Sequence, residues 1–245
     1  MTFHSFRVTI NKIKIGWKRF ITVLLSAKKK GLETMRKVFL WNVLLNNVDK
    51  PVRYVSEDFD LPKSEWKFSF SYLIEMNVEE NDQILVLSAM TKEQQVQENY
   101  LLFKNEVKKI LKAKHASGTF KEIIQPSKFE DSHTCLRFFK TVAARLEDGD
   151  RIYYDMTGGM KPYSFSMFIA MAYAAKAARD ISVEQLVYVS LYTGKTKEEQ
   201  NAEPPVATLW DLTSLFTLNE IAGNVLPGQK ASSDRMLECI IGDED

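Results

Sequence analysis

The stretch RIYYDMTGGMKPYSFSMFIAMAYAAKAA, residues 151–178, decides how this chain is expected to fold. Its short apolar run Ile152–Tyr154 favours a β-strand, and the run rich in alanine and methionine from Lys161 onward favours a long helix. Between them, Thr157-Gly158-Gly159 favours a turn, since glycine adopts backbone conformations that other residues avoid. The stretch therefore predicts a strand, a tight turn and a buried helix in direct succession.

This turn has the features of an anion-binding site. The first N–H groups of a helix have no partner within the helix, and the helix dipole favours negative charge at that end. Lys161 adds a full positive charge directly after the two glycines, which let the backbone approach a ligand closely. The turn matches neither the Walker A pattern nor the G-x-G-x-x-G dinucleotide pattern. We therefore expect a phosphate-bearing ligand, although the motif identifies no common nucleotide.

The alternation of strand and helix extends over most of the chain. Apolar, β-branched runs predict strands at residues 37–45, 52–55, 84–88, 120–124, 152–154 and 185–191. Helical spacing of apolar residues predicts helices at residues 93–114, 132–146, 161–178 and 206–225, while Phe68–Met76 fits either a strand or a helix. Alternation of this kind is typical of α/β proteins whose parallel sheet is covered on both faces. We therefore predict a Rossmann-like fold.

Three of the expected helices show which side chains should face the sheet. The helix at residues 93–114 is expected to bury Leu101, Leu102, Val107, Ile110 and Leu111. The helix at residues 132–146 is expected to bury Leu136, Phe139, Val142 and Ala143. In the helix at residues 161–178, Met167 and Met171 are expected to pack in the core rather than to recognise a ligand.

Charge is distributed unevenly along the 245 residues, although the net charge is only +1. Ten lysines and arginines against one glutamate give residues 1–37 a charge of +9. The remaining 23 basic and 31 acidic residues give the rest of the chain a charge of −8. A mildly acidic body argues against nonspecific binding to duplex DNA, which depends on many contacts with phosphates.

The chain is expected to have three parts. Residues 1–34 form a basic leader with two open interpretations, a weakly ordered segment or an amphipathic helix on a membrane surface. Its longest apolar run, Phe20–Leu25, is far shorter than the ~20 residues that span a bilayer, and it lacks the pattern of a signal peptide. The sheet domain is expected at residues 35–203, followed at residues 204–245 by a helical segment and a tail. We expect a cytoplasmic protein.

The cysteines and histidines predict no metal site. Cys135 and Cys239 lie far apart, and the three histidines form neither an H-E-x-x-H motif nor a cluster with the cysteines. The expected role of both cysteines is packing as reduced thiols. We expect neither a metal nor an organic cofactor.

Ligands of doubly wound sheets bind beyond the carboxyl ends of the strands, where the strand order reverses. Mostly small or polar residues follow the predicted strands, and the expected ligand-binding residues are Asn46, Asn47, Thr91, Asp155, Thr157, Gly158, Gly159, Met160, Lys161, Tyr192 and Thr193. A structural role is the alternative for several of them. Residues 46–47 and 192–193 would then close loops, Asp155 would cap the turn, and Met160 would pack in the core.

A series of motifs follows in a fixed order over residues 36–225. They are K-P-V-R-Y at 50–54, D-Q-I-L-V-L at 82–87, Thr91, E-N-Y at 98–100, G-D-R-I-Y-Y-D-M-T at 149–157, G-G-M-K at 158–161 and D-L-T-S-L-F-T-L-N-E at 211–220. In this order they resemble the CARF domain, the CRISPR-associated Rossmann fold that senses cyclic oligoadenylates in type III CRISPR defence. Two turns depart from the family's pattern: Thr157-Gly158-Gly159 replaces a T-H-G turn, and Asn46-Asn47 replaces a G-T-G-like turn.

The resemblance implies that two copies of the chain pair about a two-fold axis and bind a cyclic oligoadenylate across a shared groove. Lys161 and the glycine amides of both copies would grip the phosphates, and the adenine bases would enter flanking pockets. Effectors of this family usually carry a HEPN ribonuclease domain, whose arginine–histidine motif does not occur here. A stand-alone CARF protein is therefore expected.

Two functions are consistent with this resemblance. A ring nuclease would cleave the ring slowly and without metal, with cyclic tetra-adenylate favoured over cyclic hexa-adenylate. Lys161 would then stabilise the developing charge, and Thr157, Asn46 or Thr91 would orient the ribose. A non-catalytic sensor would instead signal through its basic N-terminal segment or C-terminal helix to a membrane or protein partner. A generic nucleotide-binding enzyme has no supporting motif.

Overall fold

The computed structural model of the chain describes residues 35–46, 48, 52–126, 132–191 and 204–225. The strands in these ranges are β1 (Lys37–Asn42), β2 (Arg53–Val55), β3 (Gln83–Met90), β4 (Ser117–Ile124), β5 (Arg151–Asp155), β6 (Ser182–Leu191) and β7 (Val206–Asp211). The helices are α2 (Ser69–Asn77), α3 (Gln94–Ala113), α4 (Ser132–Ala143), α5 (Lys161–Ala177) and α7 (Thr213–Ala222). The leader predicted at residues 1–34 lies outside the described residues.

All seven strands join one sheet in the order β2-β7-β6-β5-β1-β3-β4. The five strands from β4 to β6 are parallel, whereas β7 runs antiparallel to β6 and pairs in parallel with β2. From β1 the chain first winds outward through β3 to β4, and then returns to the other side of β1 to form β5 and β6. The winding therefore reverses between β1 and β5, which is the arrangement of a doubly wound sheet. The predicted Rossmann-like α/β fold is confirmed at this level.

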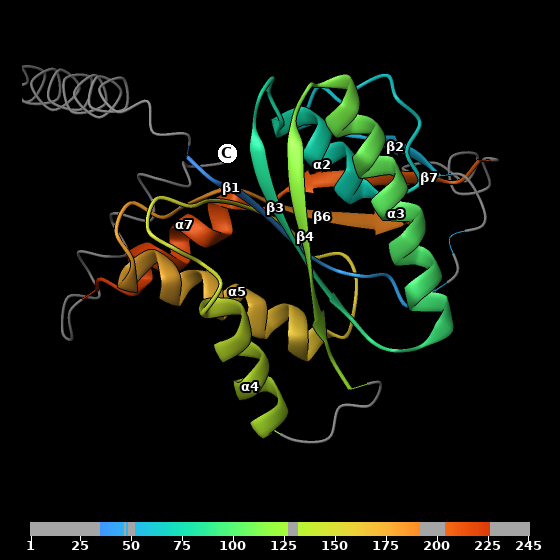
Figure 1. The fold of residues 1–245 in the computed structure, drawn as a ribbon. Coiled ribbons are helices and arrows are strands. Elements are labelled where there is room, and N and C mark those ends of the chain that lie inside the picture. Colours follow the sequence, from blue (N-terminus) through green and yellow to red (C-terminus); the bar gives the residue numbers. More distant parts are fainter. Residues whose placement is uncertain (1–34, 47, 49–51, 127–131, 192–203, 226–245) are drawn as a thin grey trace, which may run out of the picture. The chain divides into compact units, whose positions relative to one another are not determined.

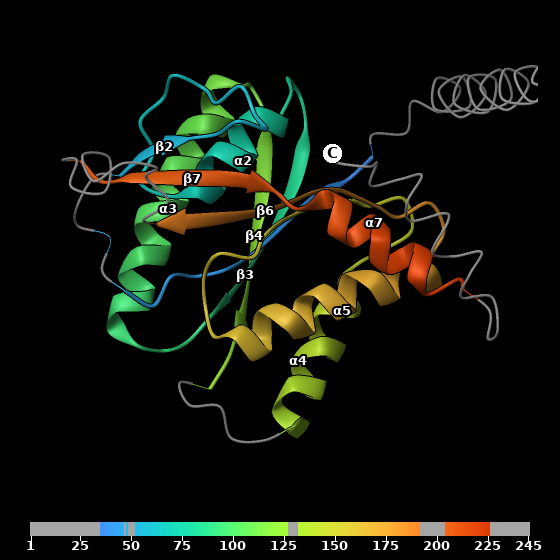
Figure 2. The same cartoon turned by 180° about the vertical axis from the view of Figure 1, so that it is seen from behind.

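Helices cover both faces of the sheet: α2 and α3 lie on one face, and α4, α5 and α7 on the other (Figures 1 and 2). Alternate residues of β1 show why its sequence is apolar throughout. Phe39 and Trp41 belong to the core under α2 and α3, whereas Val38 and Leu40 belong to the core under α4 and α5. A strand buried on both faces needs apolar residues at every position, and it therefore lacks the alternation of a half-exposed strand.

The ambiguous segment Phe68–Met76 forms helix α2. Its serines are buried but paired, because Ser71 Oγ donates a hydrogen bond to Glu106 of α3 and Ser69 Oγ donates one to Asp155 of β5. Phe70 of α2 stacks on Trp41 of β1 with ring centroids 5.0 Å apart. These contacts explain why a segment with strand-like alternation packs as a helix across the sheet.

Two predicted helix faces are wrong in part. Leu101 of α3 is 58% exposed, and Leu102 is also exposed, whereas Tyr100 and Phe103 are buried. The buried positions of α3 recur every three or four residues from Val96, and Leu101 and Leu102 fall between them. In α4, Leu136 is 61% exposed because the helix turns Phe138 toward the core instead, beside Val142, which is buried as predicted. The other residues expected on these two faces are buried or half-buried, and Met167 and Met171 are buried as predicted.

The helix predicted at residues 206–225 is wrong in its first part. Val206–Asp211 forms strand β7, which pairs with β6 and β2, and helix α7 begins only at Thr213. Leu209 is buried because β7 lies within the sheet rather than on a partner surface. Residues 204–225 therefore continue the sheet domain, and the separate segment expected after residue 203 does not begin there.

Within the described part of the chain, no helix is both long enough and apolar enough to cross a membrane.

Candidate functional site

The carboxyl ends of β1 and β5 meet at the point where the winding of the sheet reverses. Trp41 near the end of β1 is paired with Asp155 at the end of β5. The chain leaves β5 through Met156–Met160 and enters α5 at Lys161, so the glycine-containing turn lies directly at this switch point. In doubly wound sheets this crevice is the usual position of a ligand.

Both glycines of the turn pack against Asn42, the last residue of β1. A Cβ atom on Gly158 would lie 2.1 Å from the carbonyl oxygen of Asn42. A Cβ atom on Gly159 would lie 2.5 Å from the Cβ of Asn42, and Gly159 also has a φ of +78°. The glycines were expected to make room for a ligand. In this structure the glycines are needed because the turn packs closely against β1 of the same chain.

Asn42 is the centre of a buried hydrogen-bond network. Its Nδ2 donates to the hydroxyls of Tyr154 (3.3 Å) and Ser164 (3.1 Å), and its Oδ1 accepts from Gln125 Nε2 (3.2 Å). Ser164 Oγ in turn donates to the carbonyl oxygen of Gly158 at 3.2 Å. The network joins the ends of β1 and β4 to the turn and to α5, so it fixes where the turn lies.

Asn42 and Ser164 were not among the site residues expected from the sequence. The available signal was Asn42 itself, a polar residue in the otherwise apolar run from Val38 to Leu45. Such a residue, when buried, must have hydrogen-bond partners from elsewhere in the fold. Its fully buried partner Tyr154 has a pKa raised by that burial, and it stays neutral as a donor to the Ser164 carbonyl at 3.1 Å.

The carboxylate of Asp155 is engaged within the protein. Its Oδ2 accepts from Ser69 Oγ at 2.6 Å, and its Oδ1 accepts from the Thr157 N–H at 2.9 Å. The second contact closes the turn in the manner expected of a capping residue. Burial raises the pKa of Asp155, and the hydrogen bonds from Ser69 and Thr157 lower it by less.

The Asp155→Asn variant is expected to become more stable than the native chain at higher pH. The difference between their free energies of unfolding should grow as pH rises. A raised pKa means that the folded state binds the proton more tightly, so the native chain loses folding free energy as pH rises through that pKa. Asparagine keeps one acceptor for Thr157 and offers a donor to Ser69, without ionising. Urea unfolding between pH 4.5 and pH 8 should show the difference growing by at most ~1.4 kcal/mol per pH unit.

Asp148→Asn is the control for this experiment, because folding shifts the pKa of Asp148 in the opposite direction to that of Asp155. The pKa of Asp148 is lowered, chiefly by the backbone N–H and side chain of Arg179. The native Asp148 therefore gains stability as pH rises through its folded pKa, and its replacement should show no gain at high pH. Parallel pH profiles for Asp155→Asn and the native chain would contradict the prediction.

Thr157 ties the turn to the neighbouring strand. Its Oγ1 accepts a hydrogen bond from the Val189 N–H of β6 at 2.9 Å, and the residue is half-buried. The Thr157 side chain also forms a hydrogen bond with the Asp155 carboxylate, which lowers the pKa of Asp155. The predicted ribose-orienting residue therefore has a structural contact in addition to any contact with a ligand.

The open part of the turn is positive. The backbone N–H groups of Gly158, which is buried, and of Gly159 and Met160, which are half-buried, meet no hydrogen-bond acceptor among the residues that the structure describes. Lys161, the first residue of α5, is exposed beside them. Met160 is half-buried and packs against the core under α5. Unpaired amides beside an exposed ammonium group make this end of α5 attractive to an anion.

The remaining predicted site residues lie at the ends of neighbouring strands or outside the residues that the structure describes. Thr91 directly follows β3 and is buried, and its Oγ1 has no hydrogen-bond partner in the described part of the chain. Asn46 is exposed, and its carbonyl oxygen accepts from Asn99 Nδ2 of α3 at 2.7 Å. Asn99 also binds the Leu44 carbonyl oxygen at 2.9 Å, so it holds the chain that leaves β1. Asn47, Tyr192 and Thr193 are outside the described residues.

The described residues group no three or more His, Cys, Asp or Glu side chains in a way that could hold a metal ion. His133 lies exposed in the first turn of α4, and Asp155 is buried against Ser69. The turn thus offers backbone amides and one ammonium group. Such a set stabilises negative charge, whereas proton transfer would need a group that titrates near neutral pH.

These features define a doubly wound α/β protein with an anion-directed turn at its switch point. No protein-family model matches the sequence, and the curated proteins give no match to it either.

Proposed function

We propose that the chain binds a cyclic oligoadenylate, cyclic tetra-adenylate in preference to cyclic hexa-adenylate, between two copies and cleaves it slowly without metal. The observation that carries the proposal is the turn from Gly158 to Lys161 at the switch point, with unpaired amides and an exposed ammonium group. The motif order that resembles CARF domains supplies the ligand class. The turn supplies the charge and the donors that a phosphodiester needs.

The proposed reaction is an internal transesterification. A ribose 2′-oxygen forms a bond to the adjacent phosphorus, and the bond from that phosphorus to the 5′-oxygen breaks. The 2′-hydroxyl proton passes to water, and the departing 5′-oxygen takes a proton from water, which leaves a 2′,3′-cyclic phosphate. Lys161 and the amides of Gly158 and Gly159 would stabilise the charge on the phosphoryl oxygens. Without a positioned base, turnover is expected to be slow.

The surface of α5 supports pairing of two copies. Phe165, Ile169 and Tyr173 are 65%, 42% and 55% exposed and follow one another at four-residue spacing, so they form one apolar stripe along the helix. The stripe begins one turn after Lys161. A dimer formed through it would include the helix that carries Lys161 at its start.

Phe165→Glu together with Ile169→Glu is expected to convert a dimer into a monomer. Each substitution would place a charge in an interface that the stripe would otherwise bury, and a buried unpaired charge is strongly unfavourable. Sedimentation velocity at micromolar concentration should show the change in mass. Leu101→Glu is the matched control, since Leu101 is similarly exposed but lies on α3. A native chain that sediments as a monomer, or an equal effect of the control, would refute pairing through α5.

A second candidate is a sensor that binds the ring without cutting it. The observation that favours it is the internal engagement of Asp155 with Ser69 and of Thr157 with Val189. Both groups then hold the turn, and Lys161 acts on the phosphate alone. Such a sensor would signal through the basic N-terminal segment or the C-terminal helix to a membrane or a protein partner.

The two candidates are separated by incubating the full chain with labelled cyclic tetra-adenylate and cyclic hexa-adenylate in the presence of a chelator. Linear products ending in a 2′,3′-cyclic phosphate support the ring nuclease. Tight binding with an intact ring after many hours supports the sensor. Failure to bind either ring refutes both candidates.

A further inference from the structure

Strand β4 ends the sheet and leaves one edge open. It pairs with β3 along Ser117–Ile124, and no described strand lies on its other side. The N–H groups of Ser117 and Gln125 donate to carbonyl oxygens at the two ends of β3. In a parallel ladder the N–H and C=O of one residue point to the same side, so those of Glu122 and Ile124 point to the open edge.

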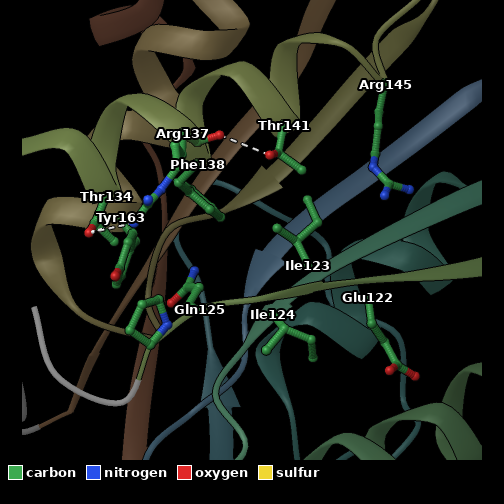
Figure 3. A pocket seen from close by; sticks show the side chains of 11 residues that line it. Glu122, Ile123, Ile124, Gln125, Thr134, Arg137, Phe138, Thr141, Arg145 and Tyr163 are labelled. Atoms are coloured by element: carbon green, nitrogen blue, oxygen red, sulfur yellow. Dashed lines mark hydrogen bonds between the residues drawn. The ribbon is translucent and has the colours of Figure 1, made fainter.

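A groove runs beside this edge, between β4 and α4. Its volume is about 390 Å³, and its lining comes from Glu122–Pro126 on the strand side and from α4 with the turn that follows it on the other, together with Tyr163 of α5. Figure 3 shows the Ile123 side chain pointing toward α4, while Glu122 and Ile124 point away from it. One wall is therefore a free strand edge with a buried apolar side chain, and the other wall is a helix.

The helical wall is basic. Arg137, Thr141 and Arg145 follow one another at four-residue spacing and all line the groove. Neither arginine forms a salt bridge within the described residues, and Arg137 is exposed while Arg145 is half-buried. Glu122, the acidic lining residue, points away from this wall.

The two arginines come from successive parts of the same wall of the groove. Arg137 lies within α4 (Ser132–Ala143), and Arg145 lies in the turn that follows it, where its N–H donates to the Val142 carbonyl oxygen. In a β-strand, side chains four residues apart lie on the same face and are separated by about 13 Å. An extended chain beside β4 would direct the side chains of one face toward α4, where Arg137, Thr141 and Arg145 line the groove together with Ile123.

We propose that this groove binds an extended acidic peptide segment of a partner protein, which joins the sheet as a further strand beside β4. Its backbone would pair with the outward N–H and C=O groups of Glu122 and Ile124, which is recognition by strand addition. The first and fifth residues of the segment would be acidic and would contact Arg137 and Arg145. The third residue would be apolar, and the second and fourth could be any residue. The Gly158–Lys161 turn takes no part, so this inference does not depend on the proposed function.

The test uses the full chain and a fluorescein-labelled peptide with Glu-Thr-Val-Thr-Glu between Gly-Ser flanks. Fluorescence anisotropy should show saturable binding that weakens with salt. Replacing both glutamates with glutamine should weaken binding at least tenfold, since each charged contact is lost. N-methylation of the peptide amides that face β4 should abolish binding, because strand pairing needs those donors.

Protein variants locate the peptide. Arg137→Glu and Arg145→Glu should each weaken binding about tenfold or more, whereas Lys140→Glu changes the charge equally on α4 outside the groove and should not. Ile124→Pro removes an outward N–H and leaves the bonds to β3 in place, so it should fold and lose the peptide. Circular dichroism checks the fold of each variant.

Three outcomes would overturn the proposal. Unchanged binding of the N-methylated peptide would exclude strand addition, and equal effects of Lys140→Glu and Arg137→Glu would exclude the groove. No binding of the peptide, together with an Ile124→Pro variant that changes sedimentation, would assign the edge to a second copy of the chain instead.

Discussion

The Lys161→Ala variant is expected to bind cyclic tetra-adenylate roughly 100-fold more weakly than the native chain, or weaker still. A charged hydrogen bond to a phosphate contributes about 1.5–3 kcal/mol, and the variant loses it once in each copy of the proposed dimer. The cleavage rate should fall by about 100-fold, because Lys161 also opposes the charge that develops on the phosphoryl oxygens. Binding is measured by calorimetry, and cleavage by separating the products under single-turnover conditions.

Lys176→Ala provides the matched control for Lys161→Ala. Both lysines are exposed on α5, but Lys176 lies in the last turn, at the opposite end from the glycines. The control variant should bind and cleave as the native chain does. A Lys161→Ala variant with native affinity would remove the main support for an anion at the turn. A variant with lower affinity and a native rate of cleavage for bound ring would show that Lys161 only holds the phosphate.

Gly158→Ala is expected to destabilise the fold by about 3 kcal/mol or more, in the upper range for overpacking a filled site. The added Cβ would lie 2.1 Å from a backbone oxygen of β1, and a backbone atom in a central strand cannot rotate away as a side chain can. The melting temperature should fall by roughly 6–12 °C, given the usual dependence for a domain of this size. Thermal unfolding followed by circular dichroism measures this change.

Gly149→Ala separates the steric effect from the general cost of losing a glycine. Gly149 has a φ of +83°, and an added Cβ would meet no atom within 4 Å. Its replacement should cost only about 1 kcal/mol, from backbone strain alone. If Gly158→Ala lowers the free energy of unfolding no more than Gly149→Ala does, the turn does not pack closely on Asn42.

The sequence predicted the local elements around the turn closely. The expected strand at residues 152–154 and helix at residues 161–178 correspond to β5 (Arg151–Asp155) and α5 (Lys161–Ala177). Each depends on signals within a few residues, namely an apolar run, two glycines, and a run rich in alanine and methionine. Local signals of this kind need no knowledge of the rest of the fold.

Strand β7 shows where local patterns were insufficient. Leu209, Leu212 and Leu215 have helical spacing, and this favoured one helix over the whole of residues 206–225. Val206–Asp211 instead forms a strand that pairs with β6 and β2. The backbone hydrogen bonds to these two strands outweigh the weak local preference for a helix.

The sequence alone predicts the α/β class and the strand–turn–helix unit, and it shows a lysine two residues after a pair of glycines. Only the tertiary structure decided that the unit lies at the reversal of the sheet and that its glycines pack on Asn42. It also decided that Asp155 turns toward Ser69 and that a basic groove lies beside the open edge of β4. The physical reason is sequence separation: Asn42 meets Gly158, Ser164 and Gln125 through contacts across the sheet, and no local pattern records such partners.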